Sequence, residues 1–268
     1  MSSIRECLEQ GEHLNPLDLH KEIKRKNVKV TASTIETSDS KGWGLEGAAK
    51  LDWSEWLPFA AKKYNISPDP SDYLLVPVFT IPTDIPNRNG VGFPLSELIK
   101  FNPEYGMQAF KTFKGKPTFV EHANEDVTQA KGVIADTFMR KMVGYNGIWK
   151  VLELLTFDRT RDPDLCRDIL SGEMNSYSMG AYVDSYLCSY CGAEIGRCSH
   201  LHPKKPFDFY RLGDKLVYRK VVNPVGFETS AVKVPAYSVA VDEGLFSMGA
   251  DLVSERVRGS KRLQVNTI

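Results

Sequence analysis

Phe119-Val-Glu-His-Ala-Asn-Glu-Asp126 and Glu173-Met-Asn-Ser-Tyr-Ser-Met-Gly180 are the two segments that say most about the fold and the chemistry of this chain. The first segment places a histidine beside acidic residues, and the second places a serine in a strand of small residues. The chain that joins them reads as strand, strand, helix and strand. Because a serine hydroxyl is a weak nucleophile until an imidazole takes its proton, His122 and Ser178 are candidates for the base and the nucleophile.

The residues before the serine segment predict a strand followed by a short helix. Residues 148–157 are apolar and β-branched enough for a strand. Asp162 and Pro163 then supply an N-cap and a proline at the first helical position, and Gly172 stands where a C-terminal cap is expected. In the strand that follows, side chains alternate, so Ser176 and Ser178 share a face with Gly180. This pattern cannot choose between the two serines.

Two further elements are expected before residue 82. Apolar and aromatic residues at helical spacing over 51–64 predict an amphipathic helix, in which Pro58 should cause a kink or mark a later start. Residues 73–81 predict a strand, and Pro77 within it indicates an edge position or a bulge.

A second chemical feature is Cys188-Ser-Tyr-Cys-Gly-Ala-Glu-Ile-Gly-Arg-Cys-Ser-His200. Three thiols and an imidazole within thirteen residues are the donor set of a closed, tetrahedral structural zinc site. The sequence therefore predicts structural Zn²⁺ on Cys188, Cys191, Cys198 and His200, and His202 could replace His200. With four protein ligands, no coordination position is left open for catalysis.

Composition indicates a globular, intracellular protein. The 268 residues are 42% apolar, and 34 basic residues balance 34 acidic ones, so no overall field favours nucleic acid. No apolar run approaches the roughly 18 residues of a membrane span, and the first residues lack the apolar core of a signal peptide. Five cysteines, three of them clustered, argue for a reducing compartment rather than a disulfide framework.

Several motifs occur in an order that resembles a known family. The segments are Asn87-Arg-Asn-Gly-Val-Gly-Phe-Pro-Leu-Ser-Glu97, Gly115-Lys-Pro-Thr-Phe-Val-Glu-His122, Lys131-Gly-Val-Ile-Ala-Asp136, Asp168-Ile-Leu-Ser-Gly-Glu-Met-Asn-Ser-Tyr-Ser-Met-Gly180 and Phe227-Glu-Thr-Ser-Ala-Val-Lys-Val-Pro-Ala236. In this order they resemble the prohead (procapsid maturation) proteases of tailed bacteriophages, which are similar in fold to the herpesvirus assemblins. The resemblance covers residues 74–240.

The resemblance selects among the candidate site residues. The family's Ser-x-Gly arrangement implies Ser178 as the nucleophile, and its Glu-x-Ser position implies Glu228 as the acid that orients His122. Glu121, Asp126 and Glu153 remain alternatives for the acid. If the stretch at Glu121 is extended, its side chain points away from the face of His122.

The resemblance also implies the fold class and the organisation of the chain. We expect an α+β fold, with a bent, mainly antiparallel sheet or partial barrel, flanking helices and a small zinc knuckle insertion. The expected parts are an N-terminal arm and amphipathic helix (1–70), a prohead-protease-like domain (71–245) with the knuckle inserted at 186–204, and a C-terminal tail (246–268).

The implied function is that of a serine endopeptidase in phage capsid maturation. Its substrates would be scaffold and capsid-protein pro-segments and the protease itself, inside the viral prohead in the host cytoplasm. A homo-oligomer is expected, without nucleic acid or membrane partners. The alternative is a zinc-stabilised structural or scaffold component of the capsid that has kept the protease fold without its activity.

Overall fold

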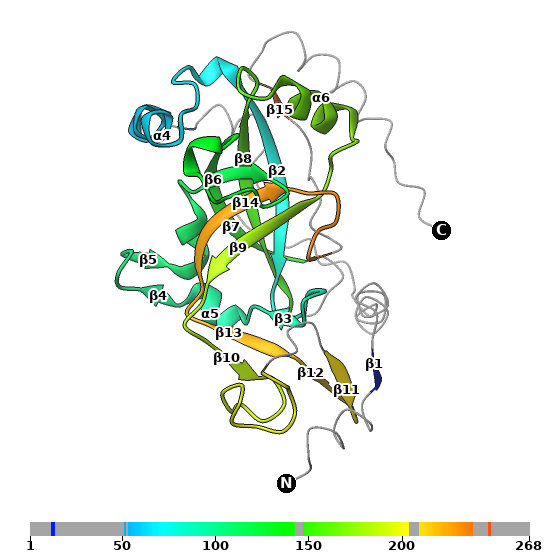
Figure 1. The fold of residues 1–268 in the computed structure, drawn as a ribbon. Helices are drawn as coiled ribbons and strands as arrows, with labels where there is room; N and C mark the ends of the chain where they lie inside the picture. Colours follow the sequence, from blue (N-terminus) through cyan, green and yellow to red (C-terminus); the bar gives the residue numbers. More distant parts are fainter. Residues whose placement is uncertain are drawn as a thin grey trace, which may run out of the picture.

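The computed structural model describes residues 51, 53–142, 147–203 and 209–237, and the backbone of two short strands, β1 (Glu12–His13) and β15 (Phe246–Ser247). Strands dominate this part of the chain, and its helices are few and short (Figure 1). The fold is therefore α+β, as predicted.

The main sheet has seven strands and curls into a half-barrel (Figure 1). In spatial order the strands are β15, β2 (Tyr73–Pro82), β8 (Trp149–Asp158), β7 (Gly132–Lys141), β6 (Pro117–Val120), β14 (Val225–Ala231) and β9 (Tyr177–Tyr182). All neighbours in this sheet are antiparallel except β6 and β14, which run parallel. The predicted bent and mainly antiparallel sheet is thus confirmed.

Strand β2 is buried along its whole length. Leu74, Val76 and Val78 pack in the largest apolar cluster of the described residues, whereas Leu75 packs in a separate cluster with Leu154. Because alternate side chains point to opposite faces, both faces of β2 are covered, which explains its continuous apolar sequence. Pro77 itself is in regular register with Leu154 of β8, and the bulge of β2 lies further along the strand, between Phe79 and Ile81.

The helix predicted over residues 51–64 is shorter than expected. The chain forms a 3₁₀ turn, η2 (Trp53–Glu55), and the α-helix α4 begins only at Leu57 and ends at Tyr64. Pro58 lies in the first turn of α4, where its missing N–H breaks no helical hydrogen bond, so the proline marks a later start and not a kink. Of the two outcomes predicted for Pro58, the later start is therefore confirmed, and residues 53–55 form a 3₁₀ turn in place of α-helix.

Helix α4 packs on the main sheet. Its buried side chains form an apolar cluster with residues of β6 and β7; the members are Leu57, Ala60, Ala61, Tyr64, Ile66, Tyr73, Phe119, Ala130 and Val133. The indole rings of Trp53 and Trp56 lie beside each other with centroids 5.0 Å apart and pack against this cluster. The aromatic residues before α4 are therefore docked on the core.

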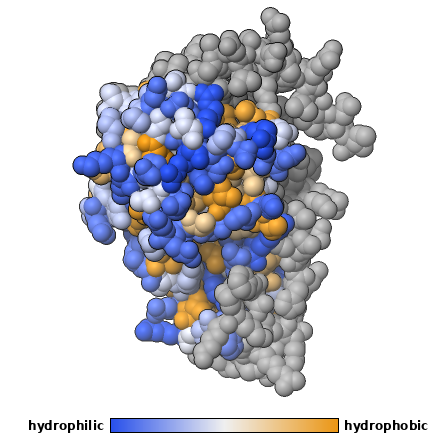
Figure 2. Space-filling model, turned by 45° about the horizontal axis from the view of Figure 1, so that its top comes forward, coloured by the Kyte–Doolittle hydropathy of each residue, from blue (hydrophilic) through white to orange (hydrophobic). Residues whose placement is uncertain are grey.

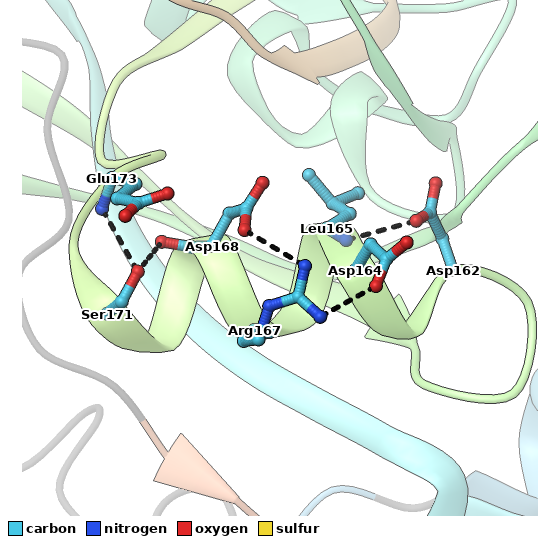
Figure 3. Close-up of polar contacts among 7 residues, drawn as sticks. All are labelled: Asp162, Asp164, Leu165, Arg167, Asp168, Ser171 and Glu173. Atoms are coloured by element: carbon cyan, nitrogen blue, oxygen red, sulfur yellow. Dashed lines mark hydrogen bonds and ion pairs between the residues drawn. The ribbon is translucent and has the colours of Figure 1, made fainter.

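Helix α6 (Pro163–Ser171) has the ends that the sequence predicts (Figure 3). The Asp162 carboxylate accepts a hydrogen bond from the Leu165 N–H at 3.0 Å, and Gly172 ends the helix in the left-handed conformation at φ 85°. On the outer face, Arg167 forms ion pairs with Asp164 and Asp168. The inner face buries Leu165, Cys166 and Ile169, and burial raises the pKa of the Cys166 thiol to about 12, so Cys166 is a packing residue.

The remaining elements are short and surround the main sheet. Between β2 and β8 lie β3 (Val91–Gly92), α5 (Leu95–Ile99), β4 (Phe101–Asn102), β5 (Met107–Gln108) and the 3₁₀ turns η4 (Ala109–Phe113) and η5 (Val127–Gln129); η3 (Pro70–Asp72) precedes β2. After β9 come β10 (Ser185–Cys188), β11 (Tyr210–Leu212), β12 (Lys215–Val217) and β13 (Arg219–Val222). Asn87 begins a turn, and its side chain accepts hydrogen bonds from the N–H groups of Asn89 and Val91.

Some expectations concern residues outside the described part of the chain. They are the N-terminal arm before residue 51, apart from the backbone of β1, and the tail over 246–268, apart from the backbone of β15. Among the described helices, none is long and apolar enough to cross a bilayer. On the face drawn in Figure 2, apolar side chains form patches interrupted by polar ones.

Candidate active site and metal centre

The two candidate catalytic segments are held on either side of one strand, β14. β6, which leads to His122, pairs with β14 on one edge, and β9, which carries Ser178, pairs on the other (Figure 1). Ser230 of β14 is in register with Phe119 of β6 and with Ser178 of β9. Directly opposed residues in neighbouring strands lie about 4.5–5.5 Å apart between Cα atoms, so β14 brings the two segments close together.

His122 lies in the turn that follows β6, where the backbone is no longer extended. Glu121 and His122 both have left-handed backbone conformations, with φ of 49° and 57°, which are uncommon for residues other than glycine. The Glu121 N–H still donates to the carbonyl of Ala231, yet the His122 ring contacts Glu228, three residues earlier in β14. The stretch is thus not extended at Glu121, and the argument from strand alternation does not apply there.

The acid that meets His122 is Glu228. His122 Nδ1 lies 2.8 Å from Glu228 Oε1, and the carboxylate is completely buried whereas 42% of the histidine side chain is exposed. The hydrogen bond to Glu228 raises the pKa of His122, burial opposes this, and the negative charges of Glu228 and Glu121 reinforce it. An acid on Nδ1 fixes the tautomer that leaves Nε2 as the proton acceptor.

The other acids proposed for His122 are engaged elsewhere. Glu121 accepts a hydrogen bond from the Lys233 N–H through its Oε1, at 2.9 Å. Asp126 caps η5 and accepts from both the N–H and the hydroxyl of Thr128. Asp126 thus caps its own loop, whereas Glu121 ties the histidine turn to the segment that follows β14.

Glu153 is the remaining alternative, and it belongs to a different environment. It is completely buried on β8, where its Oε2 accepts from the Thr229 hydroxyl at 2.7 Å. Burial raises the pKa of Glu153 to about 8. Its contact is with the residue next to Glu228 in β14, and no hydrogen bond joins it to His122 among the described residues.

Of the two candidate serines, Ser178 is the one set into the sheet. Ser178 lies in β9 and is 7% exposed, whereas Ser176 precedes the strand and its hydroxyl donates to the Asn175 side chain at 3.2 Å. No hydrogen bond joins Ser178 to His122 among the described residues. Hydrogen bonds between a catalytic serine and its histidine are often long in the free enzyme and tighten when substrate binds.

Gly180 shows that Ser178 and the Glu228 carboxylate share one face of the sheet. A Cβ built on Gly180 would lie 2.6 Å from Glu228 Oε1, so the carboxylate occupies the space on the side-chain face of Gly180. Ser178 is two residues earlier in the same strand and therefore points to that same face. Ser178, Gly180 and the Glu228 carboxylate therefore lie on one face of the sheet, and His122 contacts that carboxylate.

Ser230 is a site residue to which the sequence reasoning gave no role. It is fully buried, and its hydroxyl donates to Glu228 Oε2 at 2.6 Å. The Glu-x-Ser motif was a signal for it, because residues two apart in a strand share a face.

The cysteine-rich segment folds into a compact turn after β10. Cys188 ends this strand, its N–H donates to the Ala193 carbonyl and its carbonyl accepts from the Gly192 N–H, both at 2.8 Å. Gly192 has φ of 74°, which is the conformation that favours glycine. The turn packs in an apolar cluster whose buried members are Cys188, Leu201, Tyr210 and Val217.

Four side chains of this turn form a cluster that could hold a metal ion. Their ligand atoms all lie within 4.8 Å of one another, and the residues are Cys188, Cys191, Cys198 and His200. The set is the one that the sequence predicts. It includes His200, whereas the carbonyl of His202 accepts a hydrogen bond from Arg219 at 2.8 Å.

The environment of His200 fits a metal ligand. Its Nδ1 is buried and makes no hydrogen bond to any residue that the structure describes, while its carbonyl accepts from the Tyr210 hydroxyl at 2.7 Å. A buried polar nitrogen without a partner is costly, and a metal ion would take up its lone pair. Three thiols and an imidazole suit zinc, and four protein donors leave no open position.

Comparison with known proteins gives no relative from which a function could be transferred. No protein-family model matches the chain, and no curated protein and no solved structure matches it.

Proposed function

We propose that this protein is a serine endopeptidase of the prohead-protease type, with an assemblin-like fold. The observation that carries the proposal is the 2.8 Å contact between His122 Nδ1 and the buried Glu228 carboxylate, beside the strand that carries Ser178. A histidine oriented by a buried acid, next to a serine on the same face of the sheet, is the arrangement that activates a serine hydroxyl.

In this mechanism each of the three side chains has a separate task. The Ser178 hydroxyl attacks the scissile carbonyl carbon while His122 Nε2 accepts its proton. Glu228 stabilises the resulting imidazolium, and backbone N–H groups hold the oxyanion. His122 then gives the proton to the leaving amine, and water cleaves the acyl-enzyme by the same route.

The Cys/His cluster supports the second part of the proposal, a structural Zn²⁺ in a knuckle inserted after β9. The ion would be held by Cys188, Cys191, Cys198 and His200. It would cross-link the turn and take no part in catalysis. The cluster packs against β11 and β12 through Tyr210 and Val217. The metal would therefore stabilise the packing of this turn on β11 and β12.

The substrates follow from the resemblance of the motifs. We infer that they are scaffold and capsid-protein pro-segments, and the protease itself, within the immature capsid, where the protein would act as a homo-oligomer. The test is incubation of the purified protein with its own Ser178→Ala variant and with scaffold protein, followed by mass spectrometry of the termini. New termini that depend on active protein support the proposal, and their absence under all assembly conditions contradicts it.

One observation favours a second candidate, a zinc-stabilised structural component of the capsid that has kept the fold without activity. Among the described residues no hydrogen bond joins Ser178 to His122. In this case the protein would bind scaffold or capsid protein without cutting it, and Ser178→Ala would have no effect on capsid maturation.

A further inference from the structure

Beyond its contact with His122, the Glu228 carboxylate is held by two residues that no catalytic step uses. Oε2 accepts the Ser230 hydroxyl at 2.6 Å, and Oε1 occupies space that is open only because Gly180 has no Cβ. The two carboxylate oxygens thus have different neighbours. One faces the imidazole and the other faces a buried hydroxyl.

The structure assigns Ser230 and Gly180 as positioning residues that hold Glu228 against His122, an inference that rests on the proposed function. Ser230 is 0% exposed, so its hydroxyl cannot reach a substrate and cannot serve as a second nucleophile. Its register opposite Ser178 places the donor at the level of the proposed nucleophile. Ser230 therefore fixes the rotation of the carboxylate.

The physical reason is the burial of a charged group. A completely buried polar group is costly unless it is hydrogen-bonded, and Ser230 supplies the Glu228 carboxylate with one hydrogen bond besides that of His122. Without the Ser230 hydroxyl, the carboxylate would rotate away from His122. This rotation weakens the hydrogen bond that raises the pKa of His122.

Gly180 acts by the room that it leaves. An alanine Cβ there would lie 2.6 Å from Glu228 Oε1 and 2.5 Å from Phe227 Cζ, and real Cβ atoms do not come so close. The carboxylate, the aromatic ring or the strand would have to shift. Gly180 thus leaves room for Glu228 Oε1, the oxygen that contacts His122 Nδ1.

The same strand provides a matched control at Thr229. Its hydroxyl is also buried and also donates to a carboxylate, but that carboxylate is Glu153 on β8. The other charged groups near His122 and Glu228 are Glu121 and Glu153, and both stay in place in the Ser230 variants. Thr229→Val removes a hydroxyl of the same strand without touching the Glu228 carboxylate.

The first measurement is independent of proteolysis. In Ser178→Ala protein, the His122 imidazole is titrated by NMR, with its signal assigned by its loss in His122→Asn. We expect the pKa of His122 to fall in Ser230→Ala and in Gly180→Ala, to recover in Ser230→Thr, and to stay unchanged in Thr229→Val. An unchanged or higher pKa in Ser230→Ala overturns the positioning role.

The second measurement is cleavage of a scaffold-derived peptide by proteins that keep Ser178. Ser230→Ala should lower kcat roughly ten- to a hundredfold with little change in KM, which is the size of a hydrogen bond to a charged group. Recovery by Ser230→Thr separates the hydroxyl from packing. If neither the wild type nor any variant cleaves the peptide, but the pKa of His122 still falls in Ser230→Ala, the protease proposal fails and the positioning role stands. If the wild type cleaves the peptide and Ser230→Ala changes neither kcat nor the pKa of His122, only the positioning role fails.

Discussion

The candidate active site and the Cys/His cluster are built in opposite ways. The candidate metal ligands all lie in one turn of thirteen residues, from Cys188 to His200. The candidate active-site residues come from a turn after β6, from β9 and from β14, and the contact between His122 and Glu228 joins residues 106 positions apart. The first site depends on local chain geometry, and the second depends on the pairing of three strands.

This difference has a consequence for how each site can fail. Substitution of a candidate metal ligand should lower the stability of one turn. Substitution of a residue of the proposed triad should remove activity and leave the metal content unchanged. The predictions below test this independence.

The largest effect is expected for Ser178→Ala. Cleavage should fall by about 10³-fold or more, because the triad acts as a unit, while metal content and melting temperature stay unchanged. Rates on scaffold protein and the zinc content of the same sample are measured together. Ser176→Ala is the control and should keep substantial activity, since its hydroxyl donates to Asn175. Full processing by Ser178→Ala protein would remove Ser178 from the mechanism.

Glu228→Gln should reduce turnover by on the order of 10²–10⁴-fold, because an amide can hold the wrong imidazole tautomer and does not stabilise the imidazolium by charge. Glu228 raises the pKa of His122, and His122 must be neutral to accept a proton. Residual activity in Glu228→Gln should therefore persist to lower pH than in the wild type. The measurement is kcat/KM against pH.

Glu121→Gln is the control for this variant, since Glu121 bonds the Lys233 N–H and contributes to His122 only through its charge. Its turnover should stay near that of the wild type. If Glu121→Gln or Asp126→Asn abolishes turnover and Glu228→Gln does not, the catalytic acid lies in the histidine loop.

Cys191→Ser should lower the zinc content from about one ion per chain and reduce stability by a few kcal/mol, or on the order of 10 °C in melting temperature. Atomic absorption and thermal unfolding provide the two readouts. Cys166→Ala is the matched control, because it removes a buried thiol of α6 outside the cluster and should lower stability with full metal content. Equal stability of Cys191→Ser and wild type would argue against a structural metal.

The smallest effect is expected for Glu153→Gln. Burial raises the pKa of Glu153 to about 8, so the folded state keeps a proton that the unfolded state loses near pH 4.5. The stability from this proton is fully present below pH 4.5 and is lost as pH rises towards 8. Glu153→Gln should remove this part of the pH dependence, as measured by denaturant unfolding at pH 5 and pH 8. An unchanged slope would show that Glu153 is ionised throughout this range.

Local signals in the sequence predicted several elements well. Asp162, Pro163 and Gly172 act within one turn of their own positions, so the ends of α6 are as predicted. The same holds for the metal donors, whose spacing already places them in one turn. Pro58 was also a correct signal for a later helix start, but the helical spacing of Trp53 and Trp56 continued through a 3₁₀ turn and suggested a longer helix.

The sequence could not predict the conformation at His122. A strand pattern runs up to Val120, and nothing local indicates that Glu121 and His122 both adopt left-handed conformations. These conformations are imposed by tertiary contacts, among them the hydrogen bonds from Glu121 to Ala231 and from Lys233 to Glu121.

By itself, the sequence determined the capped helix before the serine strand and the set of four candidate metal ligands, because each depends on residues close together in the chain. Only the tertiary structure decided which acid meets His122. Four carboxylates were possible, and the pairing of β14 with β6 and β9 brings Glu228 to the imidazole while Glu153 faces β14 from β8. Strand register is set by the whole sheet, so the partner of a catalytic histidine is a property of the fold and not of any one segment.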